Sequence, residues 1–332
     1  MMNARNKRVI VPAFVLIAVS ILALAFVYSH PGARNGIEGK YNFVVGIGTH
    51  SNQSSVIRAL KDGILYYRTD ISLSASQEEA LSLQHSEYGA HYLGILDYDT
   101  LPGGFSNNDW NLTAWNESVS AAVKAYPWIS SWEIWNEPWV PTFQKGYMNG
   151  SAYNYYQMTR SAYLIINAAE PNATIVCFGG APIGSYSIYL WYSKVWGYGA
   201  AKYCNAVSIH AYPSTAGPMN QSGVQMWSAW ISKYEALTGK PIWITEFGIP
   251  SSSNASVGYS PSNQEAFMVQ AFDLFNKYPY IKRVYWYDLW GLSDGPVGND
   301  FGLLNLSNPI SGKPSPAWYS FLSIYNRSMS KG

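Results

Sequence analysis

The chain has 332 residues, of which 48% are hydrophobic and only 12% are charged. This length allows one large domain or two small ones, with enough apolar residues for a sizeable core. The net charge of +1 gives no indication of a nucleic-acid or other polyanionic partner. The 14 tryptophans and 27 tyrosines fit either an aromatic-rich core or rings that stack on sugars, and composition alone favours the core.

The N-terminal residues predict a membrane-spanning helix or a signal helix. Three basic residues among the first eight precede an uncharged run over 9–28, long enough for about 30 Å of helix. The positive flank should stay in the cytoplasm, which places the rest of the chain outside. The run lacks a good cleavage site, so an uncleaved anchor is favoured over a secreted, processed protein. We expect a basic stub and anchor over 1–29, a linker over 30–40 and one folded domain over 41–332.

Sequons and cysteines are compatible with an exported glycoprotein. An exported setting permits a disulfide between Cys177 and Cys204, although the sequence does not decide whether they pair. Nine Asn-x-Ser/Thr sequons support export, at Asn52, Asn111, Asn116, Asn149, Asn172, Asn220, Asn254, Asn305 and Asn326.

After the linker, apolar runs alternate with helix-like stretches, which is typical of βα units and a parallel sheet. The expected strands are Phe43–Gly48, Ile64–Arg68, His91–Leu96, Ser130–Asn136, Thr174–Gly179, Ala206–His210, Pro241–Thr245 and Arg283–Tyr287. The expected helices are Ser54–Lys61, Ser76–Tyr88 with Ser76 as its N-cap, Thr113–Ala125, Ser151–Ala169, Ser185–Gly197, Gln221–Leu237, Ser262–Lys277 and Pro316–Tyr325.

Eight strands in strict alternation with eight helices predict a (β/α)8 TIM barrel. The alternative is a doubly wound open sheet, which usually has a glycine-rich phosphate turn after its first strand. Gly46-Ile47-Gly48 is too short a match for that turn. The longer connections, over 97–113, 137–150, 246–261 and 288–315, all follow strands, and in a TIM barrel such loops form the catalytic face.

Two glutamates stand where predicted strands open into loops. Glu137 lies in Trp-Glu-Ile-Trp-Asn-Glu-Pro (132–138), and Glu246 lies in Ile-Trp-Ile-Thr-Glu-Phe-Gly (242–248). A charge in such apolar surroundings is costly unless it has partners or a function. Glycoside hydrolysis with retention needs two carboxyl groups about 5–5.5 Å apart, and carboxylates from the fourth and seventh strands of a barrel could meet over one sugar.

These motifs resemble those of the clan A glycoside hydrolases. Residues 135–138 and 245–248 look like the acid/base and nucleophile motifs of that clan. Ser-Ile-His-Ala-Tyr-Pro (208–213) resembles the sixth-strand motif of family 5 and family 39 type enzymes. Leu-Gly-Ile-Leu-Asp-Tyr (93–98) resembles the third-strand motif of family 39-like enzymes, although several families of the clan have a histidine there. The resemblance spans about residues 43–320.

The resemblance implies that Glu137 is the acid/base and Glu246 the nucleophile. Asn136 matches the residue that hydrogen-bonds the sugar 2-hydroxyl, an interaction that strengthens in the transition state. Arg68 matches the arginine that hydrogen-bonds the nucleophile and keeps it ionised, with a surface salt bridge as the alternative.

Four further residues are candidate substrate contacts. His210 and Tyr212 match the pair that touches the substrate and the nucleophile. Trp286 matches the platform under the reacting sugar, and a core position is the equally weighted alternative. His50 is either a sugar contact or an ordinary loop histidine.

No catalytic metal or cofactor is expected, because the five histidines show no paired ligand spacing and the two cysteines lie far apart. A serine hydrolase is not indicated either, since no Gly-x-Ser-x-Gly motif occurs. We therefore expect a retaining hydrolase of a β-linked glycan, with long loops favouring endo action. The alternatives are a transglycosylase that remodels a cell-envelope glycan and a non-catalytic carbohydrate-binding protein. The membrane is expected as a partner only through the N-terminal helix, and a monomer is favoured.

Overall fold

The fold was analysed in a computed structural model. The described residues belong to one compact unit, which spans Gly39–Gly332. The expected anchor over 1–29, most of the linker and His50 lie outside the described residues. None of the helices within the described residues combines the length and the apolar character that crossing a membrane requires. The structure describes residues 40–49, 53–101, 111–144, 150–213, 221–251, 259–290, 301–304 and 314–330.

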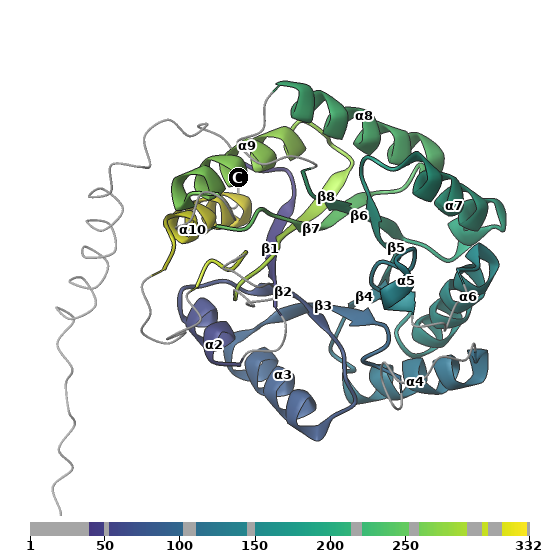
Figure 1. Ribbon diagram of the computed structural model, residues 1–332. Helices are drawn as coiled ribbons and strands as arrows, with labels where there is room; N and C mark the ends of the chain where they lie inside the picture. Colours follow the sequence, from purple (N-terminus) through teal and green to yellow (C-terminus); the bar gives the residue numbers. More distant parts are fainter. Residues whose placement is uncertain are drawn as a thin grey trace, which may run out of the picture. The chain divides into compact units, whose positions relative to one another are not determined.

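Eight parallel strands close into a barrel in the order β1-β2-β3-β4-β5-β6-β7-β8, and helices surround it (Figure 1). The prediction of a (β/α)8 barrel is therefore confirmed. The strands are β1 (Val44–Gly48), β2 (Tyr66–Asp70), β3 (His91–Leu96), β4 (Ser131–Ile134), β5 (Thr174–Pro182), β6 (Ala206–Ala211), β7 (Ile242–Phe247) and β8 (Ile281–Trp286). The helices are α2 (Gln53–Lys61), α3 (Ala75–Tyr88), α4 (Leu112–Ala125), α5 (Pro141–Gln144), α6 (Ala152–Ala169), α7 (Tyr186–Gly197), η3 (Ala200–Lys202), α8 (Gln221–Thr238), α9 (Pro261–Phe275) and α10 (Pro316–Met329).

Helix α3 begins earlier than predicted. Its N-cap is Ser74, whose side chain accepts a hydrogen bond from the backbone N–H of Gln77, so the expected cap at Ser76 is wrong. Ser74 has extended backbone angles, which an N-cap requires, whereas Ser76 is already inside the helix. The short helices α5 and η3 were not predicted, since single turns have too little periodicity to detect.

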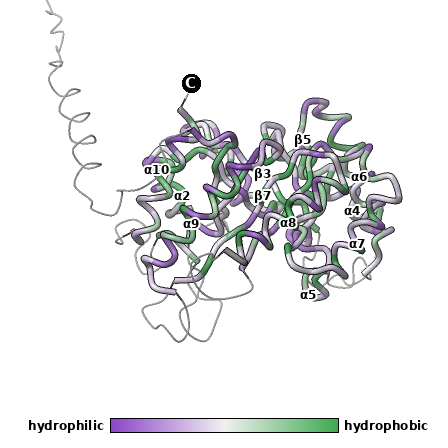
Figure 2. Tube along the Cα trace, turned by 90° about the horizontal axis from the view of Figure 1, so that it is seen from above, coloured by the Kyte–Doolittle hydropathy of each residue, from purple (hydrophilic) through white to green (hydrophobic). Residues whose placement is uncertain are grey.

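The core has two layers, as the barrel requires. A small cluster inside the barrel consists of Leu93, Val176, Ala206, Trp243 and Tyr285, all buried. The larger layer fills the space between the sheet and the helices, where six tryptophans are fully buried. Apolar and polar residues alternate along the outer helices in Figure 2, as expected for helices with one face on the sheet. The cysteines Cys177 and Cys204 form a disulfide that joins β5 to the segment before β6.

Two irregular strands shape the carboxyl end of the barrel. Neighbouring residues Ile209 and His210 of β6 pair with Ile244 and Glu246 of β7. Strand β7 therefore has one extra residue, Thr245, at this point. On β5, the register shifts between Cys177 and Ala181. Bulges of this kind re-aim side chains, and both lie next to the residues expected to be functional.

Candidate active site

The two glutamates predicted from the motifs lie close together at the carboxyl end of the barrel. Glu246 is part of β7, and Glu137 lies three residues beyond the end of β4. Glu137 has a left-handed φ of 44°, and its N–H donates to the carbonyl of Gly179 at 2.6 Å. Carboxylate oxygens of Glu137 and Glu246 and a ring nitrogen of His210 all lie within 4.8 Å of one another. Non-glycine residues with positive φ store about 1–3 kcal/mol of strain and cluster at functional sites.

Arg68 of β2 connects β4 and the segment after it to β7. Its guanidinium donates to Glu246 Oε1 at 2.6 Å, to Glu133 Oε2 at 2.6 Å and to Asn136 Oδ1 at 3.0 Å. Arg68 is only 4% exposed, and the two carboxylates beside it raise its pKa although burial alone would lower it. The guanidinium is therefore a permanent, fixed cation that orients both Glu246 and Asn136.

Glu133 was not singled out from the sequence, although it belongs to the same motif as Glu137. Its side chain is fully buried in β4, where it accepts hydrogen bonds from Arg68 and, at 3.0 Å, from Thr245 Oγ1. The extra residue on β7 lets both Thr245 and Glu246 contact groups inside the barrel. The signal that could have indicated Glu133 is its position inside an apolar strand. A buried carboxylate there is unfavourable without a cationic partner, and Arg68 lies at the end of another expected strand.

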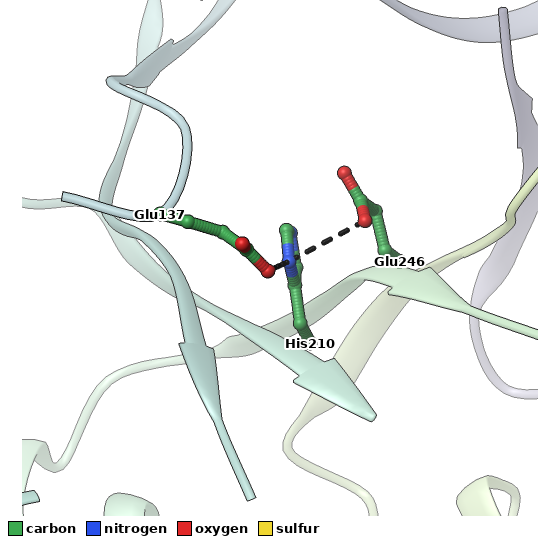
Figure 3. Close-up of side chains that lie close together, drawn as sticks. All are labelled: Glu137, His210 and Glu246. Atoms are coloured by element: carbon green, nitrogen blue, oxygen red, sulfur yellow. Dashed lines mark hydrogen bonds and ion pairs between the residues drawn. The ribbon is translucent and has the colours of Figure 1, made fainter. Parts of the chain in front are cut away.

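His210 of β6 lies between the two catalytic candidates (Figure 3). Its Nδ1 is 2.9 Å from Glu137 Oε1 and 3.4 Å from Glu246 Oε2. Burial lowers the pKa of His210, but the charge of Glu246 and the hydrogen bond to Glu137 outweigh burial and raise it above its usual value. The raised pKa thus favours the protonated form of this imidazole, which lies between the two carboxylates.

Gly180 makes room for the ring of His210. A Cβ atom at Gly180 would lie 2.2 Å from His210 Nε2, and the residue has a φ of +83° that favours glycine. The backbone N–H of Gly180 donates to Ser208 Oγ at 2.7 Å. The bulge in β5 therefore supports two functional candidates, because Gly179 holds the backbone of Glu137 and Gly180 seats His210.

Tyr212 completes the contacts to Glu246. Its hydroxyl donates to Glu246 Oε2 at 2.7 Å. Burial, together with the charge of Glu246, raises the pKa of Tyr212 well above its usual value. The phenol consequently stays protonated and acts as a permanent donor to the carboxylate.

Of the two roles weighed for Trp286, sugar platform and core residue, the structure supports the core residue and not the platform. Its ring is fully buried and packs against Phe247 of β7 and Phe267 of α9, in the layer between sheet and helices. Successive strand residues point to opposite faces, and here Tyr285 is the residue of β8 that points into the barrel. Tyr287 packs edge-to-face against Tyr212, so it is the β8-side ring next to the site.

The cluster of Glu137, His210 and Glu246 also has ligand atoms close enough to hold a metal ion. Arg68, however, lies 2.6 Å from Glu246 and already supplies a positive charge there. A second cation at the same carboxylate would be repelled by the guanidinium, which disfavours a metal ion at this cluster.

A (β/α)8 barrel with two facing carboxylates at the carboxyl ends of its strands places the protein among the glycoside hydrolases. The chain belongs to the family described as "Glycosyl hydrolase catalytic core", whose model matches residues 113–312 and therefore includes Glu137, His210 and Glu246. The expectation of a glycoside hydrolase is confirmed. No curated protein matches the sequence.

Solved structures share the fold at low sequence identity. A family 39 glycoside hydrolase from Bacteroides cellulosilyticus WH2 is 19% identical, with a TM-score of 0.63 over 87% of this chain and 64% of that one. A monomeric β-xylosidase from Caulobacter crescentus CB15 is 15% identical, with a TM-score of 0.63 over 87% of this chain and 69% of that one. An endo-β-1,3-glucanase of family 128 from Amycolatopsis mediterranei is 15% identical, with a TM-score of 0.55 over 84% and 98%. The chain thus spans less than two thirds of the first of these proteins.

Proposed function

We propose that the protein hydrolyses β-linked glycans with retention of anomeric configuration, with Glu137 as acid/base and Glu246 as nucleophile. The observation that carries this proposal is the separation of the two carboxylates, whose facing oxygens lie within 4.8 Å. Retaining enzymes have carboxyl groups about 5–5.5 Å apart, whereas inverting enzymes need about 6.5–9.5 Å to admit a water molecule. The spacing of Glu137 and Glu246 therefore favours the retaining mechanism over the inverting one.

In the first step of the proposed reaction, protonated Glu137 donates its proton to the leaving oxygen while Glu246 attacks the anomeric carbon. In the second step, Glu137 removes a proton from water, which attacks the same carbon and releases Glu246. Arg68 and Tyr212 both donate to Glu246, so they keep the nucleophile ionised and aimed. Asn136, held by Arg68, would hydrogen-bond the sugar 2-hydroxyl.

His210 can pair with the charged carboxylate in both steps of the proposed reaction. Before the attack, that charge resides on Glu246, and in the covalent intermediate it resides on Glu137. The Nδ1 atom of His210 lies within 3.4 Å of an oxygen of each, so it can pair with whichever carboxylate is charged. A protonated imidazole in this position reduces the reorganisation needed between the steps.

The structure supports a sugar-binding wall on the β7–β8 side of the site. Tyr212, Tyr287 and Phe301 form an edge-to-face cluster beside Glu246. Aromatic rings suit the C–H faces of sugars, and the long loops after the strands favour an extended, endo-type cleft. Among similar folds, a β-xylosidase and an endo-β-1,3-glucanase act on β-linked substrates, which supports the same linkage class here.

We further propose that the domain acts outside the cell, anchored by the uncharged run over 9–28 or released after its cleavage. The disulfide between Cys177 and Cys204 supports an oxidising compartment, because such bonds are rare in the cytosol. Proteolysis of intact cells, followed by detection of the domain, tests this location: protection from added protease would contradict it.

The test of function is to incubate the full-length protein with a panel of β-glucans, mannans and xylans and to follow the first product by NMR. We expect the β-anomer to appear first and to mutarotate afterwards. An initial α-anomer would show inversion and overturn the assignment of Glu246 as nucleophile. The Glu246→Gln variant should be inactive on every substrate that the wild type cleaves.

A further inference from the structure

A second cluster of carboxylates lies at the same end of the barrel, outside the proposed catalytic pair. Asp70 is the last residue of β2, and Asp97 and Asp99 follow the end of β3. The two strands are paired in parallel, with Asp70 opposite Ile95, so their ends meet (Figure 1). One carboxylate oxygen from each aspartate lies within 4.8 Å of the others.

Asp97 is the centre of this cluster and lacks full hydrogen bonding. Its side chain is fully buried, and Oδ1 accepts the N–H of Asp99 at 2.9 Å. The other oxygen, Oδ2, is buried and has no hydrogen-bond partner among the described residues. A buried, unpartnered carboxylate oxygen next to two further carboxylates calls for a bound cation or proton.

The nearest described cation is already engaged. The guanidinium of Arg68 donates to Glu133, Glu246 and Asn136. The hydrogen bonds of this guanidinium therefore go to residues outside the aspartate cluster.

We propose that Asp70, Asp97 and Asp99 bind a divalent cation of the calcium class. The ligands are oxygens only, which suits hard cations rather than zinc. Calcium takes oxygen ligands at 2.3–2.6 Å, so two oxygens on opposite sides of it are up to about 5 Å apart. The aspartate oxygens lie within 4.8 Å of one another, close enough for small side-chain adjustments to bring all three to such a cation.

The cation would have a structural role. It would tie the end of β2, which carries Arg68 two residues before Asp70, to the turn after β3. It would also neutralise carboxylates that otherwise compete for the charge of Arg68, which leaves the guanidinium to Glu246. This inference does not depend on the proposed glycosidase mechanism, since it rests on a different set of side chains.

The experiment uses full-length protein stripped of metal with a chelator. Terbium, which replaces calcium and luminesces when an aromatic residue next to the site is excited, would be sensitised by Tyr98, the residue between two of the aspartates. We expect saturable luminescence at one site, displacement by calcium, and a rise in melting temperature on calcium addition. Calcium affinity should fall at least tenfold in Asp97→Asn and in Asp99→Asn.

Asp62→Asn is the matched control, because Asp62 follows α2 and precedes β2, at the opposite end of the barrel. Its calcium affinity should equal that of the wild type. If Asp97→Asn does not fold, the exposed Asp99 decides the question. An absence of calcium binding at millimolar concentration, or equal affinity in Asp99→Asn and wild type, would overturn the proposal and leave a protonated Asp97 as the explanation of the cluster.

Discussion

Replacing Glu133 by glutamine tests whether the buried carboxylate under the site positions Arg68. Gln has the same shape but no charge, so the ion pair at 2.6 Å with Arg68 Nε becomes a hydrogen bond from the guanidinium to a neutral amide oxygen. Hydrogen bonds to charged groups contribute about 1.5–3 kcal/mol, and breaking a buried ion pair costs about 3–5 kcal/mol. Because Arg68 keeps Glu246 as a partner, we expect the free energy of unfolding to fall by about 2–4 kcal/mol.

Glu133 has no direct contact with the proposed sugar position, so its replacement should lower kcat and leave KM nearly unchanged. We expect kcat to drop by about 10–100-fold, because a loss of about 1.4–2.8 kcal/mol of transition-state stabilisation corresponds to that factor. KM should change little. Urea unfolding followed by tryptophan fluorescence and steady-state kinetics on an aryl β-glycoside provide the two readouts.

The control for Glu133→Gln is Glu265→Gln on α9, where the carboxylate is half-buried and accepts from Ser320 Oγ at 2.6 Å. This variant should lose less than about 1 kcal/mol and retain wild-type kcat. The positioning role is refuted if Glu133→Gln keeps kcat within twofold of wild type, or if kcat and KM change equally in both variants.

Three further predictions follow from the same geometry. Glu137→Gln should slow substrates with poor leaving groups at least a hundredfold more than aryl glycosides with good ones, since only the former need proton donation; equal slowing would contradict the acid role. Gly180→Ala should lower both stability and kcat because the new Cβ displaces His210, whereas Gly184→Ala, with a φ of +100° and no neighbour within 4 Å, should suffer the backbone strain alone. Because the pKa of His210 is raised in the folded state, protonated His210 stabilises the fold below about pH 6.5, and this contribution is lost as pH rises through the folded-state pKa. The difference in unfolding free energy between wild type and His210→Asn should therefore shrink at alkaline pH. A difference that stays constant with pH would disprove this prediction.

The barrel could be predicted because most strands are short, largely apolar runs that alternate with helix-like stretches. His91–Leu96 was predicted with its observed bounds. Strand β5 ends three residues later than predicted, because Gly179 and Gly180 read as a strand end although they form a bulge inside the strand. The bulge brings Gly180 against the ring of His210 on the next strand, and this contact between strands cannot be recognised from the local sequence of β5.

Site residues could be predicted from the sequence where a charged side chain stands within an apolar segment. Glu137 and Glu246 stand out as charges in apolar strand ends, and the structure brings them together with Arg68. The sequence could not choose between a sugar platform and a core position for Trp286, because both suit a tryptophan at a strand end; the burial of its ring against Phe247 decides for the core. Asp70, Asp97 and Asp99 escaped notice as a cluster because only the pairing of β2 with β3 brings them together.

The most direct test of the central claim is to trap the covalent intermediate. A 2-deoxy-2-fluoro β-glycoside with a good leaving group slows the second step, so a retaining enzyme accumulates as the glycosyl-enzyme. Peptide mass spectrometry of the labelled full-length protein should then show one sugar, attached to Glu246, and no label in Glu246→Gln. A label on another residue, or hydrolysis of natural substrate without any trapped intermediate, would contradict the account.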